Sequence, residues 1–510
     1  MRAIGESFGT RIRRIVLLGL LLAIPARLSL TPELVNDPDL WWHLRTGDWI
    51  LANGAVLHVD VFSSFRPWMA YSWGFEVLLA LLYRKFALFG AIVLVAALST
   101  AVVIALFLLM TRFQISFLRA ASLTALGAIA LAPLFAVRPW LFTILFATVE
   151  LAVLYQVRRS RSAYPLLLLP PLFCIWANTH IQFIYGVAIL ALAAADGWLA
   201  ASLRRFHAVS SFEGLSGKLW LCLVGSVAAT LINPYGAGIY RVIYQYSQHG
   251  YVLNYVDEFQ AMTFRRPVHF LVLGLLIAAV ATLAYRRKAR PFEILLLLLS
   301  AFLAFRMARD LWFLVIVALS ILAGDTASDP AVGGPSQPIG SRPARGKIVA
   351  IAIIVLAVAA LTVRSRQLSN EQLNALVAVN FPERATAFVR SQHFPGPLYN
   401  DFNWGGYLIW RLPGLAVSID GRTNLWGDRR IARFHATWSG VHDWQTDPEL
   451  ARARLVIGYI NAPLSSLLRT DSRFRLVYED ELAVVFVRGA EAATLHGNHS
   501  PVSSRPFALF

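Results

Sequence analysis

The chain has 510 residues, of which 57% are hydrophobic and 15% are charged, and its mean hydropathy is +0.58. A soluble chain of this size would have about 25% charged residues. The formal net charge is +17, but the arginine clusters lie between apolar runs, as in the cytoplasmic loops of membrane proteins. We therefore expect a polytopic α-helical membrane protein and no nucleic-acid partner. Both cysteines, Cys174 and Cys222, lie in apolar segments, so no disulfide framework or thiolate metal site is expected.

In the N-terminal region, Arg11, Arg13 and Arg14 precede an apolar run over residues 15–28. This pattern fits a cleaved signal peptide or an uncleaved first helix, and the many apolar segments that follow favour the helix. The next loop, residues 29–86, is then long and outside the membrane. Within it, residues 73–86 are interpreted as an interfacial helix, with a short crossing as the alternative.

The remaining apolar runs approach or exceed the roughly 18 residues that suggest a spanning helix. If residues 73–86 do not cross, the arginine-rich loops all fall on the inner side, which gives about eleven spans. The N-terminus is then cytoplasmic and the C-terminus extracytoplasmic, in a bacterial inner membrane. After the first run, the predicted spans lie near residues 87–110, 120–136, 141–156, 163–177, 181–203, 218–233, 268–285, 291–305, 310–323 and 347–363.

Three further regions complete the predicted domain organisation. Residues 1–363 form the multi-span domain, and its residues 324–346, rich in Gly, Pro and Ser, are predicted to be a flexible inner linker. Residues 364–490 have short alternating apolar runs and predict an extracytoplasmic α/β domain with its own core. Its expected elements are a helix at 382–392, a short helix at 404–410, and strands at 398–399, 416–419, 455–459 and 482–487. Residues 491–510 are predicted to be a disordered tail.

The first outer loop contains Asp37, Asp39 and His43 within a run flanked by paired tryptophans. A charged side chain at mid-bilayer costs about 2.5–3.5 kcal/mol, so this cluster is expected at headgroup level or in a wet cavity. A helix that begins near Asp39 would place Asp39 and His43 on one side and let Asp37 cap its N-terminus. Carboxylates there can take a proton from a hydroxyl or bind a metal ion. The alternative is an interfacial helix with a capping aspartate and anchoring tryptophans.

Polar residues in the later outer turns form a second group of candidates. Arg138 could pair with a phosphate or act as a snorkelling arginine, and Arg306 and Arg309 could hold a lipid phosphate or pair with Asp310. His180 could be a ligand or a turn residue. The candidate substrate-binding residues of these turns are Arg138, Asn178, His180, Glu258, Arg306 and Arg309. Because all of these turns fall on the predicted outer face, we expect one outward-facing site.

In the C-terminal domain, two loops follow predicted strands, where α/β proteins often bind ligands. Asp401 and Tyr407 lie in the first, and Asp420 and Arg422 in the second. An N-cap role for Asp401 and a turn role for the second loop are equally compatible with the sequence. No phosphate-binding loop, zinc-binding helix or serine elbow is present.

An acidic first outer loop, many spans and a C-terminal outer domain resemble the GT-C superfamily of membrane glycosyltransferases, mainly over residues 1–180. That superfamily includes protein mannosyltransferases, aminoarabinose transferases and oligosaccharyltransferase catalytic subunits. The sequence Asp-Pro-Asp-Leu-Trp-Trp-His at 37–43 resembles a group of bacterial membrane proteins that share this opening, the Asn-x-His turn at 178–180 and the Gly-Gly-Tyr-Leu-Ile-Trp segment at 405–410.

The resemblance implies a polyprenyl-phosphate-linked sugar donor and an extracytoplasmic glycan or protein acceptor. It also implies that the first-loop carboxylate, here Asp37 or Asp39, acts as general base or metal ligand, with a divalent cation as an open option. The region that matches the superfamily's second acidic site has Arg138-Pro139 instead. A non-catalytic protein that binds glycan, lipid phosphate or a partner is the alternative. A transporter or flippase would need more polar residues at mid-bilayer.

Overall fold

The computed structural model describes residues 8–63, 67–248, 250–251, 255–286, 290–324 and 345–489. The chain divides into two compact units, which are described separately below. The first, here the helical unit, comprises Met1–Thr31, Ile92–Ile239 and Leu253–Leu368. The second, here the α/β unit, comprises Pro32–Ala91, Tyr240–Val252 and Ser369–Phe510. The predicted tail and most of the predicted linker lie outside the described residues.

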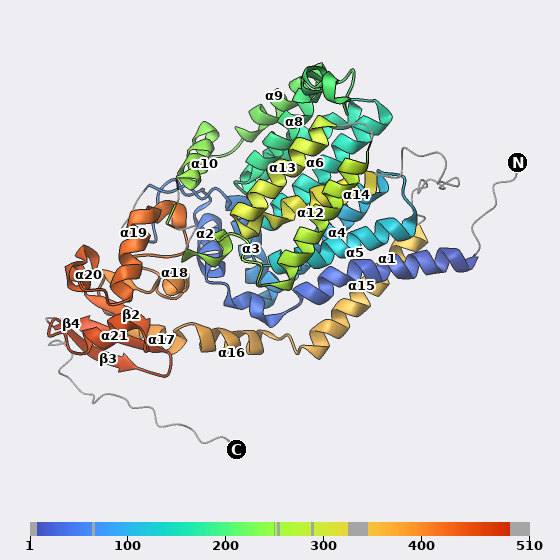
Figure 1. Cartoon of the computed structure of the whole chain (residues 1–510). Coiled ribbons are helices and arrows are strands. Elements are labelled where there is room, and N and C mark those ends of the chain that lie inside the picture. The colour runs from blue at the N-terminus through green and yellow to red at the C-terminus, as the bar shows by residue number, and fades with distance from the viewer. Residues whose placement is uncertain are drawn as a thin grey trace, which may run out of the picture. The chain divides into compact units, whose positions relative to one another are not determined.

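The helical unit contains a helix over each apolar run predicted from the sequence (Figure 1). Its helices are α1 (Phe8–Ser29), most of α4 (Leu88–Thr111), α5 (Phe117–Leu131), α6 (Trp140–Ser160), α7 (Leu169–Thr179), α8 (Phe183–Ser202), α9 (Ser216–Thr230), α12 (Pro267–Tyr285), α13 (Pro291–Arg306), α14 (Leu311–Ala323) and α15 (Arg345–Ser365).

Six helices among the described residues are long and apolar enough to cross a membrane, which supports the membrane class. They are Leu88–Thr111, Phe117–Leu134, Trp140–Ser160, Phe183–Ser202, Pro267–Tyr285 and Ile348–Ser365. Other apolar helices are shorter: α13 has 16 residues and α14 has 13. The number of eleven spans therefore stays a prediction.

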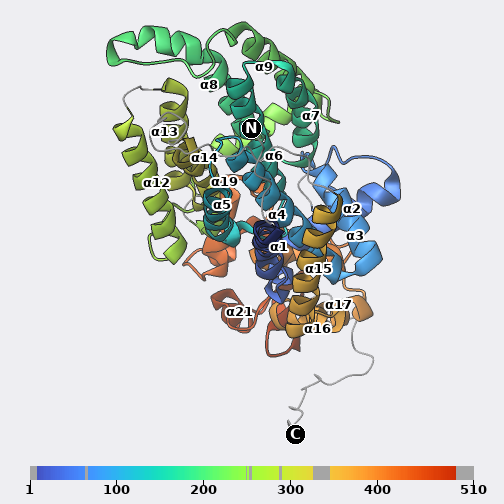
Figure 2. The same cartoon turned by 90° about the vertical axis from the view of Figure 1, so that its right-hand side faces the viewer.

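Helix α14 lies at the centre of the helical unit and packs against α5, α12 and α13, as Figure 2 shows for its neighbours α12 and α13. All but one of its 13 residues are buried. A helix that is apolar all round has no face for water, so burial among other helices is its stable position. Helices α1 and α15 pack against each other in the same unit.

The α/β unit contains a four-stranded sheet in the order β1-β2-β4-β3. Strands β1 (Leu398–Asn400) and β2 (Leu455–Tyr459) pair in parallel, whereas β4 (Ala483–Arg488) pairs antiparallel with both β2 and β3 (Phe474–Glu479). Strand β3 was not predicted, because most of its side chains are only partly buried and it lacks a clear apolar run. The predicted strand at 416–419 was wrong, since Val417 forms only an isolated bridge with Ser63.

The remaining elements of the α/β unit come from three separate parts of the sequence. They are α2 (Asp39–Asn53), α3 (Trp73–Phe86), α10 (Ile239–Ser247), α16 (Asn370–Asn380), α17 (Glu383–Gln392), α18 (Gly405–Arg411), α19 (Thr423–Trp438), α20 (Pro448–Arg452) and α21 (Pro463–Leu468). The first-loop helices α2 and α3 pack against each other, and α2 also packs against α18. The side chain of Asn370 joins the two sequence regions by bonding the backbone of Phe86 and Phe89.

Candidate functional site

The acidic run of the first loop forms the start of α2. The helix begins at Asp39 after Pro38, whose fixed φ suits a first turn. Asp37 accepts a 2.9 Å hydrogen bond from the backbone N–H of Asp39 and so satisfies a donor that the helix leaves open. Asp39 is 9% exposed and His43 is 2% exposed, while Asp37 is only half-buried. Asp37 and Asp39 thus share the helix N-terminus, where negative charge is stabilised.

Two glycines of the C-terminal region allow close approach to this helix start. A Cβ on Gly406 would lie 2.6 Å from the carbonyl oxygen of Pro38, and one on Gly421 would lie 1.8 Å from Oδ1 of Asp39. A side chain at Gly406 would therefore clash with backbone, and one at Gly421 would force the Asp39 carboxylate to move. The structure therefore brings the first-loop aspartate together with the Asp420-Gly421-Arg422 turn inside one unit.

Arg422 connects this turn to a second part of the first loop. Its guanidinium donates two hydrogen bonds to Asp420, at 2.8 and 2.6 Å, and one to Asp60 at 2.7 Å. It also lies over the ring of Trp68, 4.7 Å from the centroid. All three charged groups are almost fully buried, and the two carboxylates raise the pKa of Arg422 despite its desolvation. Arg422 and Asp420 therefore satisfy each other's charges in the interior of the α/β unit.

A second buried pair joins α2 to α3. His43 Nδ1 lies 3.1 Å from Oε1 of Glu76, and both side chains are buried. Gly47, one turn further along α2, faces the Glu76 carbonyl, since a Cβ there would lie 2.0 Å from that oxygen. Burial raises the pKa of Glu76 well above its ordinary value, an effect that the positive charge of Arg422 partly opposes. Burial therefore favours the protonated form of Glu76 beside the imidazole of His43.

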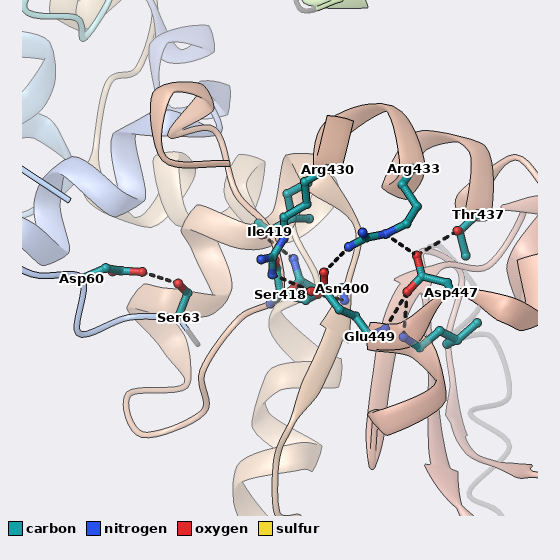
Figure 3. Close-up of polar contacts among 11 residues, drawn as sticks. Asp60, Ser63, Asn400, Ser418, Ile419, Arg430, Arg433, Thr437, Asp447 and Glu449 are labelled. Carbon is teal, nitrogen blue, oxygen red and sulfur yellow. Dashed lines mark hydrogen bonds and ion pairs between the residues drawn. The ribbon is translucent and has the colours of Figure 1, made fainter. Parts of the chain in front are cut away.

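The loop that leads into Asp420 is held by a polar network from the sheet and α19, shown in Figure 3. Asn400 donates to the carbonyl of Ile419 at 2.8 Å and accepts from the N–H of Ser418 at 3.0 Å. Arg430 donates to the Ser418 carbonyl at 3.0 Å and to Glu449 at 2.5 Å. Asn400 of the sheet and Arg430 of α19 thus both hold the backbone that leads into Asp420.

Arg433 extends the network of Figure 3 toward α20. It donates to Asp447 at 3.2 Å and also pairs with Glu449. Thr437 donates a 3.1 Å bond to the same Asp447 carboxylate, which also accepts the backbone N–H groups at the start of α20. These contacts are structural: they connect α19 to α20 behind the Asp420 loop.

The two candidates in the other loop differ in their surroundings. Tyr407 is buried, with its ring 5.0 Å from those of Trp41 and Phe381, so it belongs to the core beneath α2. Asp401 is half-buried, and its side chain accepts the N–H of Asn403 at 2.9 Å as an N-cap. Desolvation raises the pKa of Asp401 to about 6, although that hydrogen bond opposes the change.

A pocket of about 200 Å³ also lies in the α/β unit. Its wall includes Arg45, Trp49 and Phe62, together with the apolar residues that follow α18. None of the candidate residues predicted from the sequence lines it. It is a different feature from the Asp39 cluster.

The helical unit gathers several of the outer-turn candidates into a basic cluster. Glu258, in the 3₁₀ turn Asp257–Phe259, lies 3.6 Å from both Arg138 and Arg309 through its two carboxylate oxygens. The guanidinium of Arg138 lies over Trp140, and that of Arg309 lies 4.1 Å from the centre of the Phe259 ring. Two partly buried cations therefore share the carboxylate of Glu258.

His180 lies next to this cluster, in the turn between α7 and α8. Burial, and then the positive charge of Arg309, lower the pKa of His180 well below 6.5, so the imidazole is neutral. Its Nδ1 lies 2.7 Å from the hydroxyl of Thr143, which also accepts a 2.9 Å bond from the Trp176 indole. A neutral His180 can therefore accept a hydrogen bond from the Thr143 hydroxyl at Nδ1.

The other polar residues of these turns hold helix ends together. Asn178 donates to the carbonyl of Ile232 at 2.8 Å and ties α7 to the end of α9. Asp310 accepts from Gln182 at 2.8 Å and from the Tyr185 hydroxyl at 2.6 Å. Burial raises the pKa of Asp310, and the positive charges of Arg309 and Arg306 oppose that rise, so the alternative of an Arg–Asp pair stays open. Arg306 is exposed at the end of α13.

Two buried carboxylates, Asp60 and Glu76, were not among the candidates from the sequence. Each contacts a predicted residue, Arg422 or His43, from a different helix or loop, and such pairing leaves no local pattern. The signal in the sequence that could have indicated these contacts was the presence of glycine at positions 47, 406 and 421, where other elements approach closely. Across the described residues, no group of three or more His, Cys, Asp and Glu is arranged to hold a metal ion.

The comparisons with known proteins identify a fold. No protein-family model and no curated protein matches the chain. Among solved structures, the crystal structure of the oligosaccharyltransferase of Archaeoglobus fulgidus in its apo form is similar, with a TM-score of 0.51 and 10% sequence identity. The match covers 89% of this chain and 70% of that one. This likeness shows that the chain has a fold similar to that of the oligosaccharyltransferase, and the apolar helices support a membrane protein.

Proposed function

We propose that this protein is an extracytoplasmic membrane glycosyltransferase of the GT-C type, which uses a polyprenyl-phosphate-linked sugar as donor. The observation that carries the proposal is the packing of the Asp39 carboxylate against Gly421 in a chain with an oligosaccharyltransferase-like fold. Such packing presents a first-loop carboxylate from a rigid support, which proton transfer requires.

In the proposed reaction, the hydroxyl of the acceptor attacks C1 of the sugar while the bond between C1 and the phosphate oxygen breaks. The phosphate leaves with the electron pair, and the acceptor proton passes to the carboxylate of Asp39. Asp37, at the same helix N-terminus, and His43 support that carboxylate. Asp420 and Arg422 are positioning residues, because they are buried and fix the Gly421 turn.

The basic cluster of the helical unit has the second role in this proposal. Within the helical unit, Arg138, Arg306 and Arg309 are proposed to bind the phosphate of the lipid-linked donor. Support comes from the approach of two guanidinium groups to one carboxylate, Glu258, because the same groups can also bind a phosphate. The acceptor, a glycan or a protein, and the sugar are left open by this proposal.

The test compares Asp37→Asn and Asp39→Asn with Asp48→Asn in a strain that lacks the chromosomal gene. Asp48 is a matched control, since it lies on the same helix but pairs with Arg45 and Arg84 at the surface. We expect both first-loop variants, at normal abundance, to accumulate lipid-linked sugar and lose the outer glycan. The control should behave like the wild type.

Variants Arg138→Gln and Arg309→Gln should show the same accumulation, because they act on the same reaction. If folded Asp37→Asn and Asp39→Asn proteins leave the cell's glycans and lipid-linked sugars unchanged, the proposed catalytic role is wrong.

A non-catalytic binding protein is the second candidate. The observation in its favour is that buried Asp60 and Asp420 both pair with Arg422, which makes these two carboxylates structural residues. This alternative predicts that the purified protein binds a polyprenyl phosphate without any turnover of the linked sugar. Glycosyl transfer by the purified wild type would exclude it.

A further inference from the structure

Arginines from three helices converge on one buried carboxylate in the helical unit, and the proposed reaction does not use them. Glu293, in the first turn of α13, is 2% exposed. Arg158 at the end of α6 donates to it at 2.5 Å, and Arg290, just before α13, approaches within 3.5 Å. Arg286, just after α12, pairs with its other oxygen. Three guanidinium groups thus share a single negative charge.

Two more arginines add to this positive charge. Arg112, which follows α4, donates to Gln156 at 3.0 Å, while its Nε is buried and has no hydrogen-bond partner in the described part of the chain. Burial and then the repulsion of Arg159 lower the pKa of Arg112, and burial and then the repulsion of Arg158 lower that of Arg290. Arg112 and Arg159 therefore lie close enough to repel each other, and so do Arg290 and Arg158.

The other buried carboxylate beside this cluster is already engaged. Asp196 accepts bonds from Ser210 Oγ at 2.7 Å and from the backbone N–H groups of Ser211 and Phe292, at 2.5 and 3.2 Å. Even when Asp196 is counted with Glu293, five arginines face two carboxylates. Among the described residues of this cluster, positive charge therefore exceeds negative charge, which favours the binding of an anion.

The surroundings of the cluster match the headgroup region of a bilayer. Tyr285, the last residue of α12, is 87% exposed, and Tyr164, four residues after α6, is 79% exposed. Tyrosines are enriched at this level of membrane proteins. Earlier in α12, Ile277 and Val280 are also exposed, as expected for side chains that face acyl chains. A basic group between helix ends at this level fits a lipid phosphate.

We propose that the arginines at the ends of α6, α12 and α13 form a binding site for the phosphate group of an anionic phospholipid. Arg159 and Arg290 are the groups most available to that phosphate, because Arg159 is exposed and Arg290 contacts Glu293 only at 3.5 Å, whereas Arg158 and Arg286 pair with Glu293 more closely. The site is independent of the glycosyltransferase proposal.

The test uses the full-length protein purified in a neutral detergent, with lipid binding followed by native mass spectrometry. The probes are cardiolipin, phosphatidylglycerol, phosphatidylcholine and inorganic phosphate. The variant Arg159→Gln/Arg290→Gln leaves Arg158 and Arg286 on Glu293, so the fold is preserved. The control Arg204→Gln/Arg205→Gln removes the same charge from exposed residues after α8.

The wild type and the control should retain cardiolipin and phosphatidylglycerol in preference to phosphatidylcholine. Each lost arginine should weaken anionic lipid binding by about fivefold, so the double variant should bind about 25-fold more weakly. Equal binding by the double variant and the control would overturn the proposal. So would equal retention of phosphatidylcholine, or displacement of the lipids by inorganic phosphate at the same concentration, which would indicate a site for small anions.

Discussion

The Oδ1 atom of Asp39 occupies the space in which a side chain on Gly421 would begin, since a Cβ there would lie only 1.8 Å away. The acidic run of the first loop and the glycine turn of the C-terminal region therefore determine each other's position. This relationship links the candidate base to the sheet through residues that are far apart in the sequence.

Gly421→Ala should displace the Asp39 carboxylate. The new methyl group would meet a polar atom that is fixed at a helix start, and overpacking of this kind costs about 1–3 kcal/mol. We expect a lower melting temperature and a loss of glycan transfer similar to that of Asp39→Asn. The control is Gly274→Ala in α12, where a Cβ meets nothing within 4 Å. Unchanged activity in Gly421→Ala would show that the position of Asp39 is unimportant.

Arg422→Met should strongly destabilise the α/β unit. It leaves Asp60 and Asp420 buried without their cation, and breaking a buried ion pair costs about 3–5 kcal/mol. Arg422→Lys should not restore stability, because an ammonium group cannot reproduce the two-pronged contact with Asp420. Thermal unfolding and limited proteolysis would measure both. The matched variant Arg411→Met removes a half-exposed arginine from its pair with Glu383 and should cost at most about 1 kcal/mol.

The pH dependence of stability should report on Glu76. Because the pKa of Glu76 is higher in the folded protein than the ordinary 4.5, folding favours the protonated form. The contribution of Glu76 to the free energy of unfolding is therefore most favourable below pH 4.5. It is lost as the pH rises through the pKa that Glu76 has in the folded protein. Glu76→Gln mimics the neutral acid, so the variant should gain stability over the wild type as the pH is raised.

Thermal unfolding of the wild type and Glu76→Gln from pH 5 to pH 8 provides the measurement, with the half-exposed Glu383→Gln as a control that should show no such trend. A Glu76→Gln protein that becomes less stable than the wild type as the pH rises would indicate an ionised His43–Glu76 pair instead.

Thr143 and Thr148 offer a matched comparison on α6. Thr143→Val removes the hydroxyl that Trp176 and His180 both contact, and each buried partner then loses a hydrogen bond. The expected cost is about 1–3 kcal/mol. Thr148 is equally buried, but its hydroxyl bonds only the carbonyl of Ile144 in its own helix, so Thr148→Val should have a small effect. Equal melting temperatures for the two variants in detergent would contradict a structural role of the Thr143 bonds.

Patterns that are local in the sequence predicted much of the local structure. Hydropathy gave the helical membrane class, and the Asp-Pro-Asp sequence gave the helix start at Asp39 with Asp37 beside its first N–H group. The strands near 398, 455 and 482 also appear, because each is a short buried apolar run.

Contacts between distant parts of the chain were not predictable in the same way. Arg422 and Asp60 are 362 residues apart, and neither has a neighbour in the sequence that indicates the other. The basic character of the 138–309 cluster was visible in its arginines, but the sharing of Glu258 depends on tertiary packing. The expectation that all of these turns form one outward-facing site therefore stays a prediction.

The composition of the α/β unit has a consequence for biosynthesis. Residues 32–91 leave the ribosome long before residues 369–489, which complete the same unit. During that interval, Asp60 has no guanidinium and the start of α2 has no glycine turn beside it. Residues 32–91 therefore stay incompletely folded until the C-terminal residues are synthesised. We expect the protein to depend on membrane chaperones and to be sensitive to C-terminal truncation.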